Sequence, residues 1–213
     1  MARTYCSVCE RAIQICLCEH IQQQTAAVPT LVLRHTDETR HAKGSAILAA
    51  RSLSNIRLLT GQLFAEPLCR SALAQFNARS PVLLYAPHSY AEHQEESWLP
   101  SLLAGSKQDQ RLPFGCDSVI TLDGTWRNTR ELMLKNTWLH KLPVLSLMGF
   151  KSEYVLRKQK PNGVSTIEAL DIIYRFLNKE FSTEKFLSSF RAMQAAQIAK
   201  MGDEIFLRHY AKK

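Results

Sequence analysis

The chain has 213 residues, of which 46% are hydrophobic, so it can bury a sizeable core and bulk disorder is excluded. Lysine and arginine exceed aspartate and glutamate by 27 to 19, a formal net charge of +8, which favours an anionic partner such as nucleic acid. No apolar run reaches the length of a membrane span and the N-terminus lacks a signal-peptide core, so we expect a cytoplasmic protein with reduced cysteines and no membrane partner.

Four of the six cysteines lie within the first eighteen residues, spaced C-x2-C-x6-C-x-C. Two tight pairs separated by a short loop allow four thiolates to converge on one Zn2+. A reducing compartment disfavours disulfides and a redox dithiol needs only one pair, so we predict structural zinc, with an iron–sulfur cluster as the alternative. The predicted zinc-binding segment covers 1–24 and precedes a domain over 25–213. Its predicted ligands are Cys6, Cys9, Cys16 and Cys18.

Predicted strands and helices alternate after the cysteine segment. The predicted strands are short apolar runs over 30–33, 55–59, 82–85, 119–122 and 144–147. The predicted helices cover 37–54, 66–78, 127–136, 166–179 and 183 to about 209. This alternation predicts an α/β fold with a mainly parallel sheet flanked by helices. Ser165 and Glu168 have the spacing of a capping box, which marks a helix start at Thr166.

The strand predicted over 119–122 ends at Asp123, Gly124, Thr125 and Trp126. Ligands of parallel sheets bind beyond the carboxyl ends of the strands. Gly124 permits a sharp turn, Trp126 offers a stacking surface, and Asp123 can accept a proton. From the residues alone, a helix-capping aspartate followed by a core tryptophan is an equally open interpretation. The absence of a G-x-G-x-x-G or Walker A pattern gives no support to a dinucleotide fold or an NTPase.

This sequence resembles the DTW-domain family, whose Asp-x-Thr-Trp signature corresponds to Asp123, Thr125 and Trp126. The cysteine pattern and the stretches LRHTDE, VLLYAP and LRKQKPNGVSTIEAL resemble further elements of that family, in the same order. The chain departs from the family at Thr36, where proline is usual, and at Ala86, which separates Tyr85 from its proline. It also has Gly-Ser-Ala over 44–46 where Asn-Thr-Ala is common.

The resemblance implies a tRNA-uridine aminocarboxypropyltransferase with a SPOUT-like knotted fold over 25–213. The 3-amino-3-carboxypropyl group would pass from S-adenosylmethionine to N3 of a uridine, releasing methylthioadenosine; bacterial members act in the tRNA variable loop. Asp123 would be catalytic, either as a base or by orienting the donor's amino group. The donor pocket would be lined by Leu84, Tyr85, Leu122, Gly124, Thr125, Trp126, Leu145, Leu147, Ser165 and Thr166.

Basic side chains around this strand edge are predicted to contact tRNA phosphates. They are Arg34, His35, Arg127, Arg130, Lys151, Arg157, Lys158 and Lys160, although a structural role for His35 is equally open. Two other functions also stay open: an RNA methyltransferase on the same scaffold, which would release S-adenosylhomocysteine, and a non-catalytic zinc-containing RNA-binding module. The sequence does not predict an oligomeric state.

Overall fold

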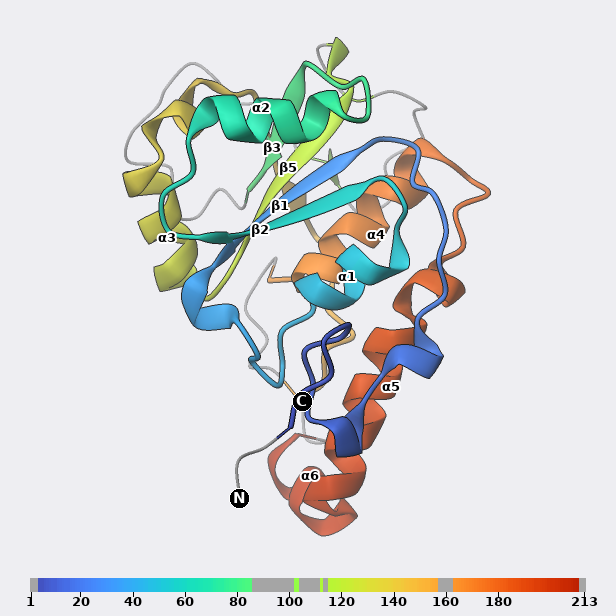
Figure 1. Ribbon diagram of the computed structural model, residues 1–213. Helices are drawn as coiled ribbons and strands as arrows, with labels where there is room; N and C mark the ends of the chain where they lie inside the picture. Colours follow the sequence, from blue (N-terminus) through green and yellow to red (C-terminus); the bar gives the residue numbers. More distant parts are fainter. Residues whose placement is uncertain (1–3, 86–101, 104–111, 113–114, 157–162, 211–213) are drawn as a thin grey trace.

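A five-stranded sheet forms the centre of the molecule (Figure 1). The computed structural model describes residues 4–85, 102–103, 112, 115–156 and 163–210. Every pairing within this sheet is parallel, and the strand order is β2-β1-β5-β3-β6. The strands are β1 (Thr30–His35), β2 (Ile56–Gly61), β3 (Pro81–Leu84), β5 (Ser118–Asp123) and β6 (Val144–Leu145). The predicted α/β fold with a parallel sheet is therefore confirmed.

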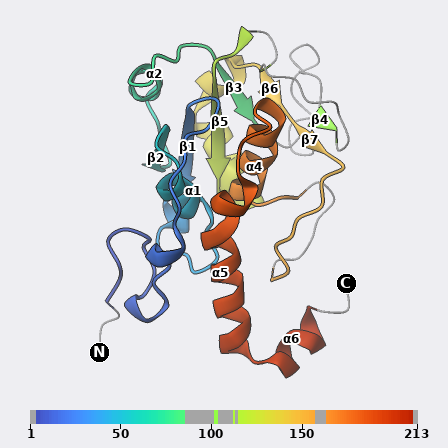
Figure 2. The same ribbon diagram turned by 90° about the vertical axis from the view of Figure 1, so that its right-hand side faces the viewer.

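Helices cover both faces of this sheet, which gives three layers (Figures 1 and 2). In β1, Val32 packs into one core while Leu31 and Leu33 pack into the other, because successive side chains of a strand point to opposite faces. Because both faces of the sheet are buried, the sequences of these strands are continuous apolar runs and do not alternate with polar residues. One face carries α1 (Ala46–Ser52), α4 (Thr166–Leu177) and α5 (Thr183–Met201), and the other carries α2 (Glu66–Ala74) and α3 (Trp126–Lys135).

The predicted helix over 37–54 is wrong in its first half. Thr36–Glu38 forms a single 3-10 turn (η3), and regular helix begins only at Ala46. Arg40 has φ 58°, in the left-handed region, which interrupts a right-handed helix. The apolar residues are gathered over 46–50, and α1 packs only this stretch against the sheet. Residues 39–45 are instead a loop beyond the carboxyl end of β1.

Two further predicted elements are each divided in the structure. The helix predicted over 183 to about 209 is α5 followed by α6 (Asp203–His209), because Gly202 has φ 85° and ends α5. The strand predicted over 144–147 is β6 followed by β7 (Leu147–Met148), which pairs with β4 (Leu102–Leu103) in a separate small sheet. Among the helices described, none is long and apolar enough to cross a membrane.

The cysteine segment packs on the side of the molecule that carries α1 and α5 (Figure 1). It contains two 3-10 turns, η1 (Ile13–Ile15) and η2 (Cys18–His20). Cys9 and Leu17 are buried in the core that α1, α4 and α5 also form. Arg51 of α1 donates from Nε to the Val8 carbonyl oxygen at 2.9 Å. The predicted segment 1–24 therefore shares its core with the predicted domain over 25–213.

Candidate active site and metal centre

The carboxyl ends of the five strands meet at one edge of the sheet. The register places Arg34 of β1 beside Asp123 of β5, and Leu84 of β3 beside Leu145 of β6. β1 and β5 are neighbours in the sheet. From β1 the chain continues to β2 on one side, and from β5 it continues to β6 on the other side, so the winding direction changes between β1 and β5. Ligand sites of open parallel sheets lie at such switch points. Two adjoining cavities open there.

The first cavity lies between the ends of β3 and β5 and the start of α4. The space within it is about 680 Å³, open solvent at the mouth included. Sequence analysis missed four of its lining residues, Thr121, Thr129, Val164 and Ala169. Seven of the ten residues predicted for the donor pocket do line it: Leu84, Tyr85, Leu122, Gly124, Trp126, Leu147 and Thr166.

The second cavity, of about 550 Å³, lies against the first and shares Gly124 and Thr166 with it. Asp123, Thr125 and Ser165 line this cavity, together with the loop that follows β1. Leu145, by contrast, is buried in the core and lines neither cavity. The predicted catalytic aspartate and nine of the ten predicted donor-pocket residues thus line the two adjoining cavities.

Hydrogen bonds fix the turn between β5 and α3. Thr125 is the N-cap of α3 and its Oγ1 accepts from the Asn128 backbone N–H at 3.2 Å, so this threonine performs the capping role considered for Asp123. The Asp123 carboxylate is buried and instead accepts from Thr166 Oγ1 at 2.6 Å, which joins β5 to α4. From the other side, Glu38 Oε1 accepts from the Thr125 backbone N–H at 3.1 Å.

Gly124 is required by close packing at this turn. A Cβ atom at this position would lie 2.8 Å from the Asn128 Cβ and 3.5 Å from the His35 Cβ. We expect Gly124→Ala to lower the free energy of unfolding by about 1–3 kcal/mol because the backbone must shift. Urea denaturation measures this loss, and Gly61→Ala is the control because its added carbon comes no closer than 3.3 Å, to the Phe64 ring, and lies 3.7 Å from the Leu63 carbonyl oxygen. Equal losses in both variants would contradict the close approach.

Two of the predicted RNA contacts are buried and already paired within the protein. Arg34 is 5% exposed, and its guanidinium donates to both carboxylate oxygens of Glu10, at 2.7 and 3.1 Å. This hydrogen bonding lowers the pKa of Glu10. His35 is 1% exposed, its Nδ1 accepts from the Asp37 backbone N–H at 3.2 Å, and its Nε2 lies 3.6 Å from Glu131 Oε2. These contacts support the structural interpretation of His35.

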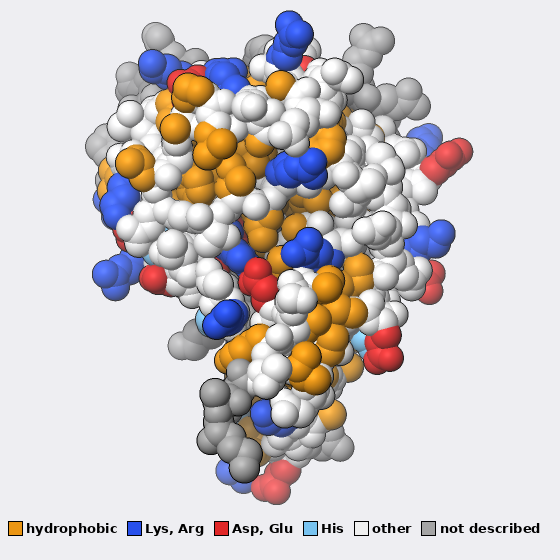
Figure 3. Space-filling model, in the orientation of Figure 1, with side chains coloured by type: hydrophobic (Ala, Val, Ile, Leu, Met, Phe, Trp, Pro, Cys, Tyr) orange, Lys and Arg blue, Asp and Glu red, His pale blue; other side chains and the backbone are white. Residues whose placement is uncertain are grey.

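The other predicted RNA contacts are distributed differently. Arg127, Arg130 and Lys151 are exposed. Arg157, Lys158 and Lys160 lie outside the residues that the structure describes. On the face drawn in Figure 3, charged side chains of both signs are scattered between hydrophobic patches and do not form a single basic stripe.

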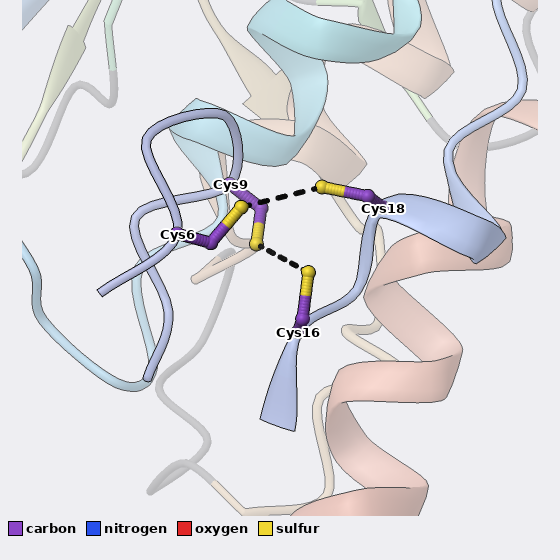
Figure 4. Close-up of side chains that lie close together, drawn as sticks. All are labelled: Cys6, Cys9, Cys16 and Cys18. Atoms are coloured by element: carbon purple, nitrogen blue, oxygen red, sulfur yellow. Dashed lines mark hydrogen bonds between the residues drawn. The ribbon is translucent and has the colours of Figure 1, made fainter. Parts of the chain in front are cut away.

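The four N-terminal cysteines converge on one point (Figure 4). Their sulfur atoms all lie within 4.8 Å of one another, with Cys6 to Cys18 at 3.6 Å and Cys9 to Cys16 at 3.7 Å. Metal–sulfur bonds of ~2.3 Å around a tetrahedral ion give sulfur–sulfur separations of about 3.8 Å. The cluster therefore fits a single ion, whereas an iron–sulfur cluster needs room for several irons and sulfides between the thiolates.

The ionisation of these thiols also favours a bound cation. Backbone N–H groups of Cys9 and Val8 donate to the Cys6 sulfur and lower its pKa to about 6, so it is largely a thiolate at neutral pH. Burial raises the pKa of Cys18, and the neighbouring Cys16 and Cys6 sulfurs raise it further. A raised pKa opposes loss of the Cys18 proton. A positive ion among the sulfurs offsets this effect, because it stabilises each thiolate that binds it.

Comparison with known proteins identifies the family to which this chain belongs. The DTW domain family model matches residues 3–198, so the chain belongs to the DTW domain family. The chain is 25% identical over 203 residues to tRNA-uridine aminocarboxypropyltransferase 2 of Macaca fascicularis, covering 92% of this chain and 64% of that protein. It is 27% identical over 221 residues to the Mus musculus protein of the same name, covering 97% and 70% respectively. This chain thus spans about two thirds of the length of these relatives. No solved structure matches it significantly.

Proposed function

We propose that this protein transfers the 3-amino-3-carboxypropyl group of S-adenosylmethionine to N3 of a uridine in tRNA. The observation that carries the proposal is the pair of adjoining cavities at the carboxyl edge of the sheet, with Asp123 of the family signature in the wall of the second. Membership of the DTW domain family and the names of the two relatives support the reaction type.

The reaction forms one bond and breaks one. Uridine N3 loses its proton, and its electron pair forms a bond to the γ-carbon of the donor. The bond between this carbon and the sulfonium sulfur breaks, and its electron pair stays on sulfur. The products are the modified uridine, neutral methylthioadenosine and one proton. Because the leaving group is already good, positioning of the two reactants supplies much of the rate.

The residues of the edge have distinct roles in this proposal. Asp123 takes the N3 proton or holds the donor's ammonium group. The first cavity takes the adenosine part of the donor, because uncharged residues line it, among them apolar side chains at strand ends. Trp126 lies in its wall, where an aromatic face suits either the sulfonium charge or a stacked base.

Exposed cations next to this edge are proposed to hold the phosphates of the tRNA. Arg127 and Arg130 extend from α3, and Lys151 precedes the start of α4. Arg34 is better suited to position its neighbour Asp123 than to reach RNA, because Glu10 occupies its guanidinium. We also propose that the cysteine cluster binds structural zinc and that the chain over 25–213 has the knotted SPOUT-like topology.

Product analysis tests the proposal. The purified protein is incubated with S-adenosylmethionine and unmodified tRNA, and small products and tRNA nucleosides are identified by mass spectrometry. Methylthioadenosine together with aminocarboxypropyl-uridine is the expected result. S-adenosylhomocysteine with a methylated nucleoside would identify a methyltransferase instead, and tRNA binding without either product would identify a binding module.

A further inference from the structure

The second cavity has a chemical character unlike that of the first. Its walls are the loop after β1, the turn after β5 and the start of α4, and charged side chains of both signs line it. The carboxylates are those of Glu38 and Asp123, and the basic side chains are those of His41 and Lys43. Among the described residues that line the first cavity, by contrast, none carries a charge.

The loop that supplies Lys43 is held in place from three directions. Gln197 of α5 donates from Nε2 to the Ala42 carbonyl oxygen at 2.8 Å, and the Tyr154 hydroxyl donates to the Lys43 carbonyl oxygen at 3.1 Å. The Arg11 guanidinium donates to the next carbonyl oxygen, that of Gly44. Three successive carbonyl groups are thus bound by three different parts of the chain. This loop presents its side chains to the cavity in a preorganised arrangement.

The Glu38 carboxylate and the Lys43 ammonium have different partners within the protein. Glu38 is largely buried, and its Oε1 accepts from the turn after β5 while its Oε2 lies 4.0 Å from His41 Nδ1. The Lys43 ammonium is exposed and donates one hydrogen bond, to the Leu156 carbonyl oxygen at 3.3 Å. An ammonium group has three donors, so two remain for a ligand.

We propose that this second cavity binds the α-amino and α-carboxylate groups of the donor, with Lys43 on the carboxylate and Glu38 on the ammonium, beside Asp123. This inference rests on the proposed function. A zwitterion needs both signs of charge within one small space, and the cavity supplies them. A uracil ring is neutral and requires neither, so the lining favours the amino-acid end of the donor over the acceptor base.

The assignment also accounts for which carbon is transferred. Gly124 and Thr166 line both cavities, so a donor that spans them has its sulfur and γ-carbon beside these two residues. Asp123 lies beside them, and its carboxylate accepts a hydrogen bond from Thr166 Oγ1. With the adenosine and the amino-acid group each held on one side, the bond between the γ-carbon and sulfur is fixed where the acceptor approaches. Lys43 is therefore a specificity-determining residue for transfer of the aminocarboxypropyl group.

Binding measurements with three ligands test the role of Lys43. Titration calorimetry compares S-adenosylmethionine, decarboxylated S-adenosylmethionine and methylthioadenosine, of which only the first carries the carboxylate. We expect Lys43→Ala to weaken S-adenosylmethionine roughly tenfold, as loss of a charge-assisted contact does, and to change the other two Kd values less than about twofold. Lys43→Arg keeps the charge and should retain most of the affinity. Lys141→Ala, at an exposed lysine that precedes β6 at the opposite edge of the sheet, should change none of the three.

Each other outcome would overturn the inference. Equal weakening of all three ligands by Lys43→Ala would mean that the side chain supports the loop and not the carboxylate. Unchanged S-adenosylmethionine affinity with a raised KM for tRNA would assign the cavity to the acceptor. Failure of the unsubstituted protein to bind either S-adenosylmethionine or methylthioadenosine would overturn the proposed function itself, and this result is distinguishable because it needs no variant.

Discussion

We expect Asp123→Asn to lower the rate of the proposed transfer by ~10²–10⁴-fold while the protein stays folded, which is the loss expected when a well-placed proton acceptor is removed. Asparagine has nearly the same volume as aspartate, and its side-chain oxygen can accept the 2.6 Å hydrogen bond from Thr166 Oγ1. The negative charge at the carboxyl end of β5 is the property that the substitution removes. Steady-state kinetics with tRNA, and Kd values for S-adenosylmethionine, are the measurements.

The value of kcat and the Kd for S-adenosylmethionine distinguish the two possible roles of Asp123, as base or as the group that orients the donor's ammonium. A fall in kcat with an unchanged donor Kd identifies the base, and a weakened donor Kd identifies the group that orients the ammonium. Asp117→Asn is a matched control at the other end of the same strand. Asp117 accepts from the Arg79 and Ser80 backbone N–H groups, so this control should lose some stability but no activity. Unchanged kcat and Kd in Asp123→Asn would show that Asp123 has neither role.

The position of Asp123 at the edge of the sheet could be predicted because it depends only on where a buried strand ends. A short apolar run followed by polar residues ends a buried strand, and in a parallel sheet all such ends lie at one edge. The resemblance to the DTW-domain family implied a donor pocket that includes Leu84, Tyr85 and Thr166, and all three line the first cavity. Hydrophobic periodicity indicated the alternation of strands and helices, and hence only the edge at which the strand ends meet.

The second cavity could not be predicted in the same way. Its loop lies within the stretch wrongly predicted as helix, and its conformation depends on Gln197, Tyr154 and Arg11, whose partners lie 155, 111 and 33 residues away. Tertiary hydrogen bonds override local propensity at such a place. Gly44 and the lack of apolar residues other than Ala42 over 37–45 were the local signals against a helix. Arg34 is a related case, because nothing local in the sequence indicates that Glu10 pairs with it.

We expect Cys16→Ser to abolish the proposed stoichiometric metal binding and to lower the free energy of unfolding by about 3 kcal/mol, or the Tm by roughly 6–12 °C. This loss is a fraction of the ~10–16 kcal/mol with which small zinc domains bind their metal, because Cys9 and Leu17 also pack into the main core. Metal content by mass spectrometry and thermal unfolding measure the two effects. Cys116→Ser is the control, since Cys116 is also partly exposed but lies outside the cluster.

Loss of the metal should also change the candidate active site, because Glu10 and Arg11, which follow the proposed ligand Cys9, contact residues there. Glu10 follows Cys9 directly, has φ 58°, and holds Arg34 beside Asp123. Arg11 follows in turn and holds the Gly44 carbonyl oxygen in the wall of the second cavity. Cys16→Ser is therefore expected to weaken S-adenosylmethionine more than methylthioadenosine, because the loop that carries Lys43 loses one of its three attachments. Full metal retention would contradict the ligand assignment, whereas metal loss with unchanged donor affinity would show that Gln197 and Tyr154 suffice to hold the loop.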